Sequence, residues 1–97
     1  MAWKTRNHLL IHYRNHRNEF PGYTVEQYDQ SGHETVEIGI RFEYADPDTD
    51  DDRIGYFGTA TGRFTGTTLD GLIVTHFVTT EGYVIGLPYN DYPLDLG

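Results

Sequence analysis

The sequence predicts an α+β domain, in which an N-terminal helix precedes an antiparallel meander of five or six short strands that could curl into a small barrel. Residues 3–17 contain no Gly or Pro, which permits a helix. Residues 36–44 alternate apolar and polar side chains, as a half-buried antiparallel strand does. Gly and Pro recur from residue 55 to residue 88, which is typical of short strands joined by turns.

At 97 residues the chain has room for one domain,. We expect a basic helical head over residues 1–20, an antiparallel β body over residues 23–88 and an extended tail over residues 89–97. The helix is expected to end at the Phe-Pro-Gly sequence that starts at Phe20. The apolar residues that fall close together at the helical period of about 100° per residue are Trp3, Leu9, Leu10 and Tyr13.

The body divides into strands at its turn signals. We expect the alternating segment 36–44 to be the central strand of the sheet, because its pattern is the longest. Turns are expected at residues 30–32, at Glu81-Gly82 and at Asp70-Gly71, the last being a strong hairpin signal. The expected strands cover residues 23–29, 36–44, 53–59, 64–69, 72–79 and 83–87.

Charge is distributed unevenly along the chain. The formal net charge is −8, from 15 acidic and 7 basic residues. Residues 1–18 hold four of the Lys and Arg residues and no acid, which leaves residues 19–97 at −12. Such a body repels nucleic acid and anionic surfaces and attracts basic proteins. We therefore expect a basic protein partner and no direct binding to nucleic acid.

The composition also bears on compartment. The chain has no Cys, which excludes disulfides, thiolate nucleophiles and cysteine metal sites. Its first residues do not resemble a signal peptide, and no segment approaches the roughly 20 apolar residues of a membrane span. We expect a cytoplasmic protein that does not bind membranes.

The most acidic segment is residues 46–52, with five Asp and one Pro. Such a run cannot pair in a sheet, so we expect an exposed loop. An EF-hand needs Gly at its sixth position and Glu at its twelfth, but Asp51 and Phe57 stand there. An EF-hand is therefore excluded, although a weak divalent-cation site in this loop stays open beside a merely solvated one.

Three histidines are spaced by four residues in the expected helix: His8, His12 and His16. Neighbouring pairs on such a helix face could share Zn²⁺, Ni²⁺ or Cu²⁺. Residues 1–18 supply no carboxylate, so a third ligand would have to come from elsewhere. The alternative is a polar face that gains charge below about pH 6.5. We expect no cofactor.

Catalytic residue patterns are sparse. Ser31 is the only serine and lies outside any nucleophile-elbow motif,. We expect His76, within an apolar strand, to be a histidine at the edge of the core with a satisfied hydrogen bond. A His–Glu acid–base pair, such as His33 with Glu34 or Glu81, stays open because spatial neighbours are not visible in the sequence.

These observations favour a small non-enzymatic protein-binding module whose carboxylates engage a basic, nucleic-acid-binding partner. Nuclease inhibitors of the immunity and phage counter-defence types work in this way. The analogy is one of type, since the chain carries no family motif. The residues expected to contact the partner are Asp46, Asp48, Asp50, Asp51 and Asp52, with Glu37 and Glu43 on an adjacent strand face and Tyr89, Asp91 and Tyr92 in the tail.

Two alternatives remain. One is a structural subunit of a larger assembly such as a virion or an enzyme complex, with the head and tail reaching its neighbours. The other is a metal-binding or enzymatic protein that uses the three histidines. The sequence does not predict an oligomeric state.

Overall fold

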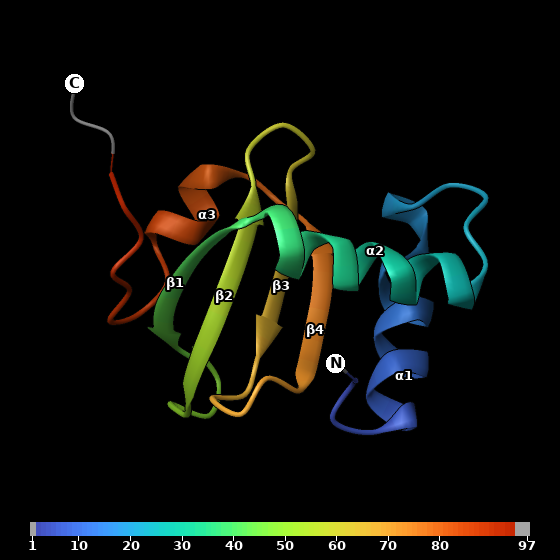
Figure 1. The fold of residues 1–97 in the computed structure, drawn as a ribbon, viewed down its shortest axis with the longest axis horizontal. Coiled ribbons are helices and arrows are strands. Elements are labelled where there is room, and N and C mark those ends of the chain that lie inside the picture. Colours follow the sequence, from blue (N-terminus) through green and yellow to red (C-terminus); the bar gives the residue numbers. More distant parts are fainter. Residues whose placement is uncertain (1, 95–97) are drawn as a thin grey trace.

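The computed structural model describes residues 2–94, which form one four-stranded sheet with helices on both of its faces and at one edge (Figure 1). A single turn of 3₁₀ helix, Arg17–Glu19, follows the first helix. The elements in chain order are α1 (Arg6–His16), α2 (Val25–Ile38), β1 (Ile40–Ala45), β2 (Asp52–Gly58), β3 (Arg63–Thr67), β4 (Ile73–Val78) and α3 (Glu81–Ile85). The predicted α+β class is confirmed.

The sheet is an open antiparallel meander in the order β1-β2-β3-β4. It has four strands rather than the expected five or six, and it does not close into a barrel. Each edge is covered by another part of the chain instead. Trp3 forms a parallel bridge with Ile73 of β4, and the C-terminal segment lies along β1, where Ala45 donates its backbone N–H to the Pro88 carbonyl at 2.9 Å.

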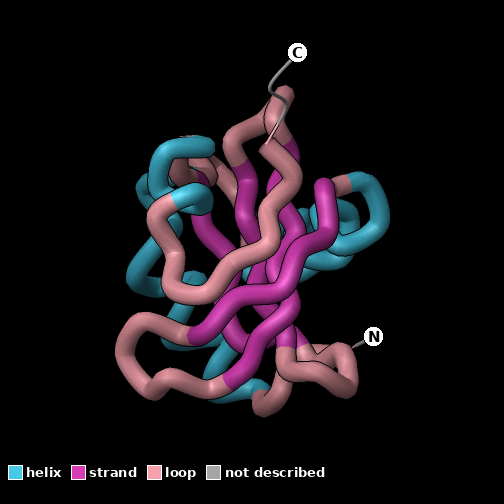
Figure 2. The backbone as a smooth tube through the Cα atoms, turned by 90° about the vertical axis from the view of Figure 1, so that its left-hand side faces the viewer, coloured by secondary structure: helices cyan, strands magenta, loops and turns pink. Residues whose placement is uncertain are grey.

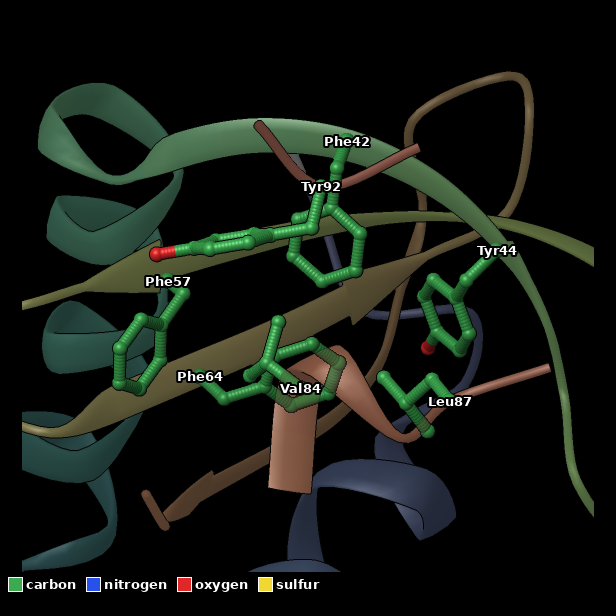
Figure 3. Close-up of a cluster of buried hydrophobic side chains, with 7 residues drawn as sticks. All are labelled: Phe42, Tyr44, Phe57, Phe64, Val84, Leu87 and Tyr92. Atoms are coloured by element: carbon green, nitrogen blue, oxygen red, sulfur yellow. The ribbon is translucent and has the colours of Figure 1, made fainter. Parts of the chain in front are cut away.

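The two faces of the sheet carry separate cores. On one face, α2 covers β2 and β3. On the other face, α3 and the tail cover β1 to β3, so that helical segments stand on both sides of the strands (Figure 2). The core beneath α3 is mainly aromatic (Figure 3). It comprises Phe42, Tyr44, Phe57, Phe64, Val84, Leu87 and Tyr92.

The first helix is shorter than predicted. It begins at Arg6 because the Thr5 hydroxyl caps it, accepting the His8 backbone N–H at 3.0 Å. Trp3 therefore lies outside the helix, where its indole N–H donates to Asp29 of α2 at 2.9 Å. The basic head is thus tied to the body through Trp3 and through Leu9, which is buried.

The expected strand at residues 23–29 and the turn at 30–32 are wrong, because both segments belong to α2. Thr24 and Gln27 form a reciprocal capping box, in which each side chain accepts the backbone N–H of the other. Such a box satisfies two otherwise unpaired donors at a helix start. The buried positions of α2 recur at helical spacing, but most are small or polar: Tyr28, Ser31, Gly32 and Thr35.

The prediction of a central strand over residues 36–44 is only half right. The alternation is real from Ile40 onward, where Phe42 and Tyr44 face the core. Before Gly39 the alternating residues belong to the helix α2, so the alternation there does not mark a strand, and Ile38 is 74% exposed. The resulting strand β1 lies at the edge of the sheet, and β2 and β3 form its centre.

Some of the loop and turn predictions are confirmed and others are wrong. The loop at residues 46–52 is confirmed up to Asp52, which begins β2, and Asp70-Gly71 does turn between β3 and β4. Gly71 takes a φ of +92° there, which favours glycine. The expected turn at Glu81 and strand at 83–87 are wrong: Thr80 caps α3, whose Val84 packs into the core together with Leu87.

The tail packs on the body as far as residue 94. Tyr92 is buried on the face of β1 and β2 that α3 covers, against the rings of Phe42 and Phe57. The end of the predicted extended tail, residues 95–97, lies outside the described residues. In the part of the chain that is described, no helix has the length and apolar character needed to cross a bilayer.

Candidate functional site

Residues 46–52, the loop between β1 and β2 together with the first residue of β2, are folded into a defined shape by their own side chains; we call this segment the acidic loop. The Asp46 carboxylate accepts the backbone N–H groups of Asp48 at 2.8 Å and Thr49 at 3.1 Å. Asp50 adopts a φ of +66°, a conformation that Asp tolerates better than most residues. The loop therefore presents its remaining carboxylates from a fixed frame.

Arg53 follows the acidic loop and lies beneath it. Its guanidinium is 3.5 Å from the Asp51 carboxylate and 4.0 Å from that of Asp46, and its side chain is only 13% exposed. This largely buried cation thus offsets part of the charge of two of the five aspartates. Asp46, whose carboxylate also accepts two loop N–H groups, serves mainly to build the loop, whereas the Asp51 side chain is 62% exposed.

The other three aspartates point their charge outward. Asp48, Asp50 and Asp52 are exposed, and within residues 2–94 no Lys, Arg or His lies at ion-pair distance from any of them. Like charges held close together on a surface repel one another and attract cations. These three carboxylates form the part of the acidic loop available to a partner.

The other predicted contact residues are divided between different surfaces. Glu43 and Asp91 lie together, since Asp91 accepts the Glu43 backbone N–H at 2.6 Å and donates its own N–H to the Glu43 carbonyl at 3.0 Å. Tyr89 is 86% exposed, as a contact residue would be. Glu37, however, is on α2, so it shares no strand face with Glu43. Tyr92 is 6% exposed and belongs to the core.

The histidines of α1 form a row along the helix. The rings of His12 and His16 stack at 5.9 Å, and His12 also contacts Trp3. His8 pairs with Thr5, and His16 pairs with Glu19. Burial, and then the neighbouring His16 and His8, lower the pKa of His12 to about 4. Among residues 2–94, no three His, Cys, Asp or Glu side chains gather closely enough to hold a metal ion.

A cavity of about 340 Å³ lies between α1 and the acidic loop; we call it the α1–loop cavity. His8 and His12 line it from α1, and Asp46 and Asp48 line it from the loop. The two features that stand out in the sequence therefore meet across one hollow. Between them lie four aromatic side chains, Tyr44, Phe64, Phe77 and Tyr83, together with Arg53.

The aromatic lining was not part of the predicted site. Phe64 lies at the centre, with ring centroids 5.2 Å from Phe77 and 5.8 Å from Tyr44. Tyr83 of α3 completes the lining, 5.6 Å from Phe77. These residues come from three strands and a helix, so no sequence spacing could have joined them.

A second arrangement that sequence reasoning missed is the contact between Ser31 and His76. Ser31 Oγ lies 2.9 Å from His76 Nε2, and His76 Nδ1 lies 3.0 Å from the Phe64 carbonyl and 2.8 Å from Thr65 Oγ1. Nδ1–H donating to the Phe64 carbonyl leaves Nε2 to accept the Ser31 hydroxyl proton. His76 and Ser31 are 0% and 2% exposed. The prediction of a satisfied His76 is confirmed, although it lies fully inside rather than at the core edge.

Comparison of the chain with family models, with curated proteins and with solved structures finds no match.

Proposed function

We propose that the protein is a small non-enzymatic binding module that engages a basic protein partner through the acidic loop. The observation that supports the proposal most directly is that Asp48, Asp50 and Asp52 are exposed and have no ion-pair partner among residues 2–94. Asp91 adds an exposed carboxylate beside β1, and Glu43 next to it is also exposed, although Arg41 lies 4.0 Å from the Glu43 carboxylate. Carboxylates fixed in this way can occupy the sites where a nucleic-acid-binding surface would hold phosphates, so the module would act as an inhibitor.

The catalytic alternative has less support. The Ser–His pair has the bonding pattern of a nucleophile and its base, but no substrate could reach side chains that are at most 2% exposed. The metal alternative needs a group of ligands, and the described residues supply none. A structural subunit is the remaining alternative, and self-association of the purified protein at micromolar concentration is the measurement that would favour it.

Capture of partners from native cell extract tests the proposal. The bait is wild-type protein or a variant that neutralises two loop charges, Asp48→Asn/Asp50→Asn. The matched control, Glu26→Gln/Glu34→Gln, removes two exposed charges from α2 instead. We expect the wild type and the control to retain a basic protein that elutes with salt. The loop variant should bind it at least tenfold more weakly, since charge-steered contacts weaken with screening.

Two results would count against the proposal. One is retention of the same protein by the loop variant and the wild type across salt concentrations. The other is failure of the wild type to retain any basic protein.

A further inference from the structure

The α1–loop cavity combines an aromatic lining with carboxylates at one wall. Phe64 is 1% exposed and forms the floor, while Tyr83 is 43% exposed and stands where the cavity meets solvent. The volume of about 340 Å³ is at the lower end of the range for ligand sites. The cavity is thus open and large enough for one extended side chain.

The electrostatic character of the cavity favours a cation. Asp46 and Asp48 both line it. Burial is the largest cause that raises the pKa of the Tyr83 hydroxyl, and the charges of Asp46 and Asp48 act in the same direction. At Tyr44 burial is again the largest cause that raises the pKa; Asp46 acts in the same direction and Arg53 in the opposite one. The negative field therefore reaches the aromatic side chains. Aromatic faces attract cations as well, by roughly 0.5–2 kcal/mol depending on desolvation.

Three groups in the lining could oppose a cation. Arg53 is already paired with Asp46 and Asp51. His12 has a pKa lowered to about 4, so it is neutral near pH 7. The third group is His8, whose Nδ1 atom is in hydrogen-bond contact with the Thr5 hydroxyl at 2.7 Å. The neighbouring His16, which does not line the cavity, contacts Glu19 at 2.9 Å. The carboxylates of Asp46 and Asp48 outweigh the positive charge of Arg53, especially since Asp51 also pairs with Arg53.

We propose that the α1–loop cavity receives a basic side chain, lysine or arginine, from the partner, with the aromatic rings around its alkyl stem and Asp48 beside its charge. This inference rests on the proposed function and names the chemistry that the acidic loop would recognise. It gives the loop a specific contact in addition to long-range attraction. Buried anchors of this kind dominate many protein interfaces.

The test uses isolated probes in place of the partner. The full chain is titrated by NMR at pH 7 with N-acetyl-lysine methylamide, with N-acetyl-arginine methylamide, and with the lysine probe acetylated on Nζ. At least one charged probe should shift the ring signals of Tyr83 and Phe77. The acetylated probe should bind at least tenfold more weakly, because it lacks the charge. The exposed ring of Tyr89, which does not line the cavity, should not shift.

Asp48→Asn and Asp50→Asn form a matched pair, since both residues are exposed in the acidic loop but only Asp48 lines the cavity. Asp48→Asn should weaken the charged probe about threefold to tenfold. Asp50→Asn should change it less than twofold. Both substitutions alter exposed side chains, so the fold should survive them.

Three results would overturn the inference: no shift at Tyr83 and Phe77 with either charged probe, equal binding of the acetylated probe, or equal weakening by the two substitutions. Any of these would leave the proposed function standing if capture of the partner still depended on the loop charges. Conversely, probe binding in the cavity together with charge-independent capture would refute the proposed function alone.

Discussion

His76 shows how a polar residue is accommodated inside this fold. Its ring is fully buried between β3 and α2, where Ser31, Thr65 and the Phe64 carbonyl surround its two nitrogens. Burial is the largest cause that lowers its pKa, to about 4, although the bond to the Phe64 carbonyl acts in the opposite direction. A buried polar group is stable when its hydrogen bonds are satisfied, and here the neutral ring meets that condition.

The protein should lose stability on acidification because of this histidine. The folded pKa of about 4 lies below the ordinary value of 6.5, so between these values the unfolded chain binds more protons. The free energy of unfolding should therefore fall as the pH drops from 6.5 to 4, by up to about 1.4 kcal/mol per pH unit for one such group. His12 contributes in the same direction.

Denaturant unfolding of wild type and His76→Gln at several pH values measures this effect. The variant should be less stable at pH 7 but should show a shallower loss between pH 6.5 and 4. Identical slopes in the two proteins would show that His76 does not carry the proton linkage.

At the scale of elements, the C-terminal segment supports the edge strand β1 rather than forming a free arm. It bonds to the β1 backbone through Pro88 and Asp91. Tyr92 packs at the end of this segment, and its hydroxyl donates to Glu81 at 2.7 Å. Burial, and then the bond to Glu81, raise the pKa of Tyr92 to about 12. The segment thereby links α3 to the edge of the sheet.

Replacing Tyr92 should reveal this structural role. We expect Tyr92→Ala to lower the free energy of unfolding by about 3 kcal/mol, as large-to-small core changes do. Tyr92→Phe, which keeps the ring and removes the hydrogen bond, should cost about 1 kcal/mol. Tyr89→Ala is the exposed control and should be nearly neutral, because its side chain is 86% exposed. Equal effects of the two alanine variants in urea unfolding would contradict the core position of Tyr92.

For the whole molecule, charge works against the compact state. The formal net charge is −8. Within residues 2–94, none of the four cations of the head, Lys4, Arg6, Arg14 and Arg17, forms an ion pair with the acidic body. The head therefore docks through Trp3 and Leu9 and leaves the charge of the body largely uncompensated. Repulsion among these like charges lowers the free energy of unfolding, and binding to a basic partner would relieve that repulsion.

Salt should therefore stabilise the protein. Raising the ionic strength from about 0.01 to 0.15 M shortens the screening length from about 30 to 8 Å, which should raise the free energy of unfolding by on the order of 0.5 kcal/mol. Asp48→Asn/Asp50→Asn should be slightly more stable than wild type at low salt, with a smaller gain on adding NaCl. Thermal unfolding at several NaCl concentrations measures both effects, and a wild type that loses stability with salt would contradict them.

The sequence by itself determined the α+β class, the helical head, the position of the acidic loop and the Asp70-Gly71 turn. Each of these depends on local chemistry: an uninterrupted helix-forming segment, a run of carboxylates that cannot pair in a sheet, and a glycine at positive φ. The T-x-x-Q capping box at Thr24 was also a local signal for α2. The prediction of a strand at residues 23–29 did not take this signal into account, and the buried face of the helix, made mostly of small and polar residues, forms no apolar stripe that would have indicated a helix.

Only the tertiary structure determined which of these elements pack against one another. The alternation at residues 36–44 has the same appearance on either side of Gly39, and packing alone separates α2 from β1. Tyr92 has no local feature that marks it as core rather than tail. The α1–loop cavity forms only because α1 packs beside β4 and α3 packs across the sheet. This packing brings the histidines, the aromatic rings and the aspartates together. Such long-range juxtapositions depend on the burial of whole faces, which no local spacing encodes.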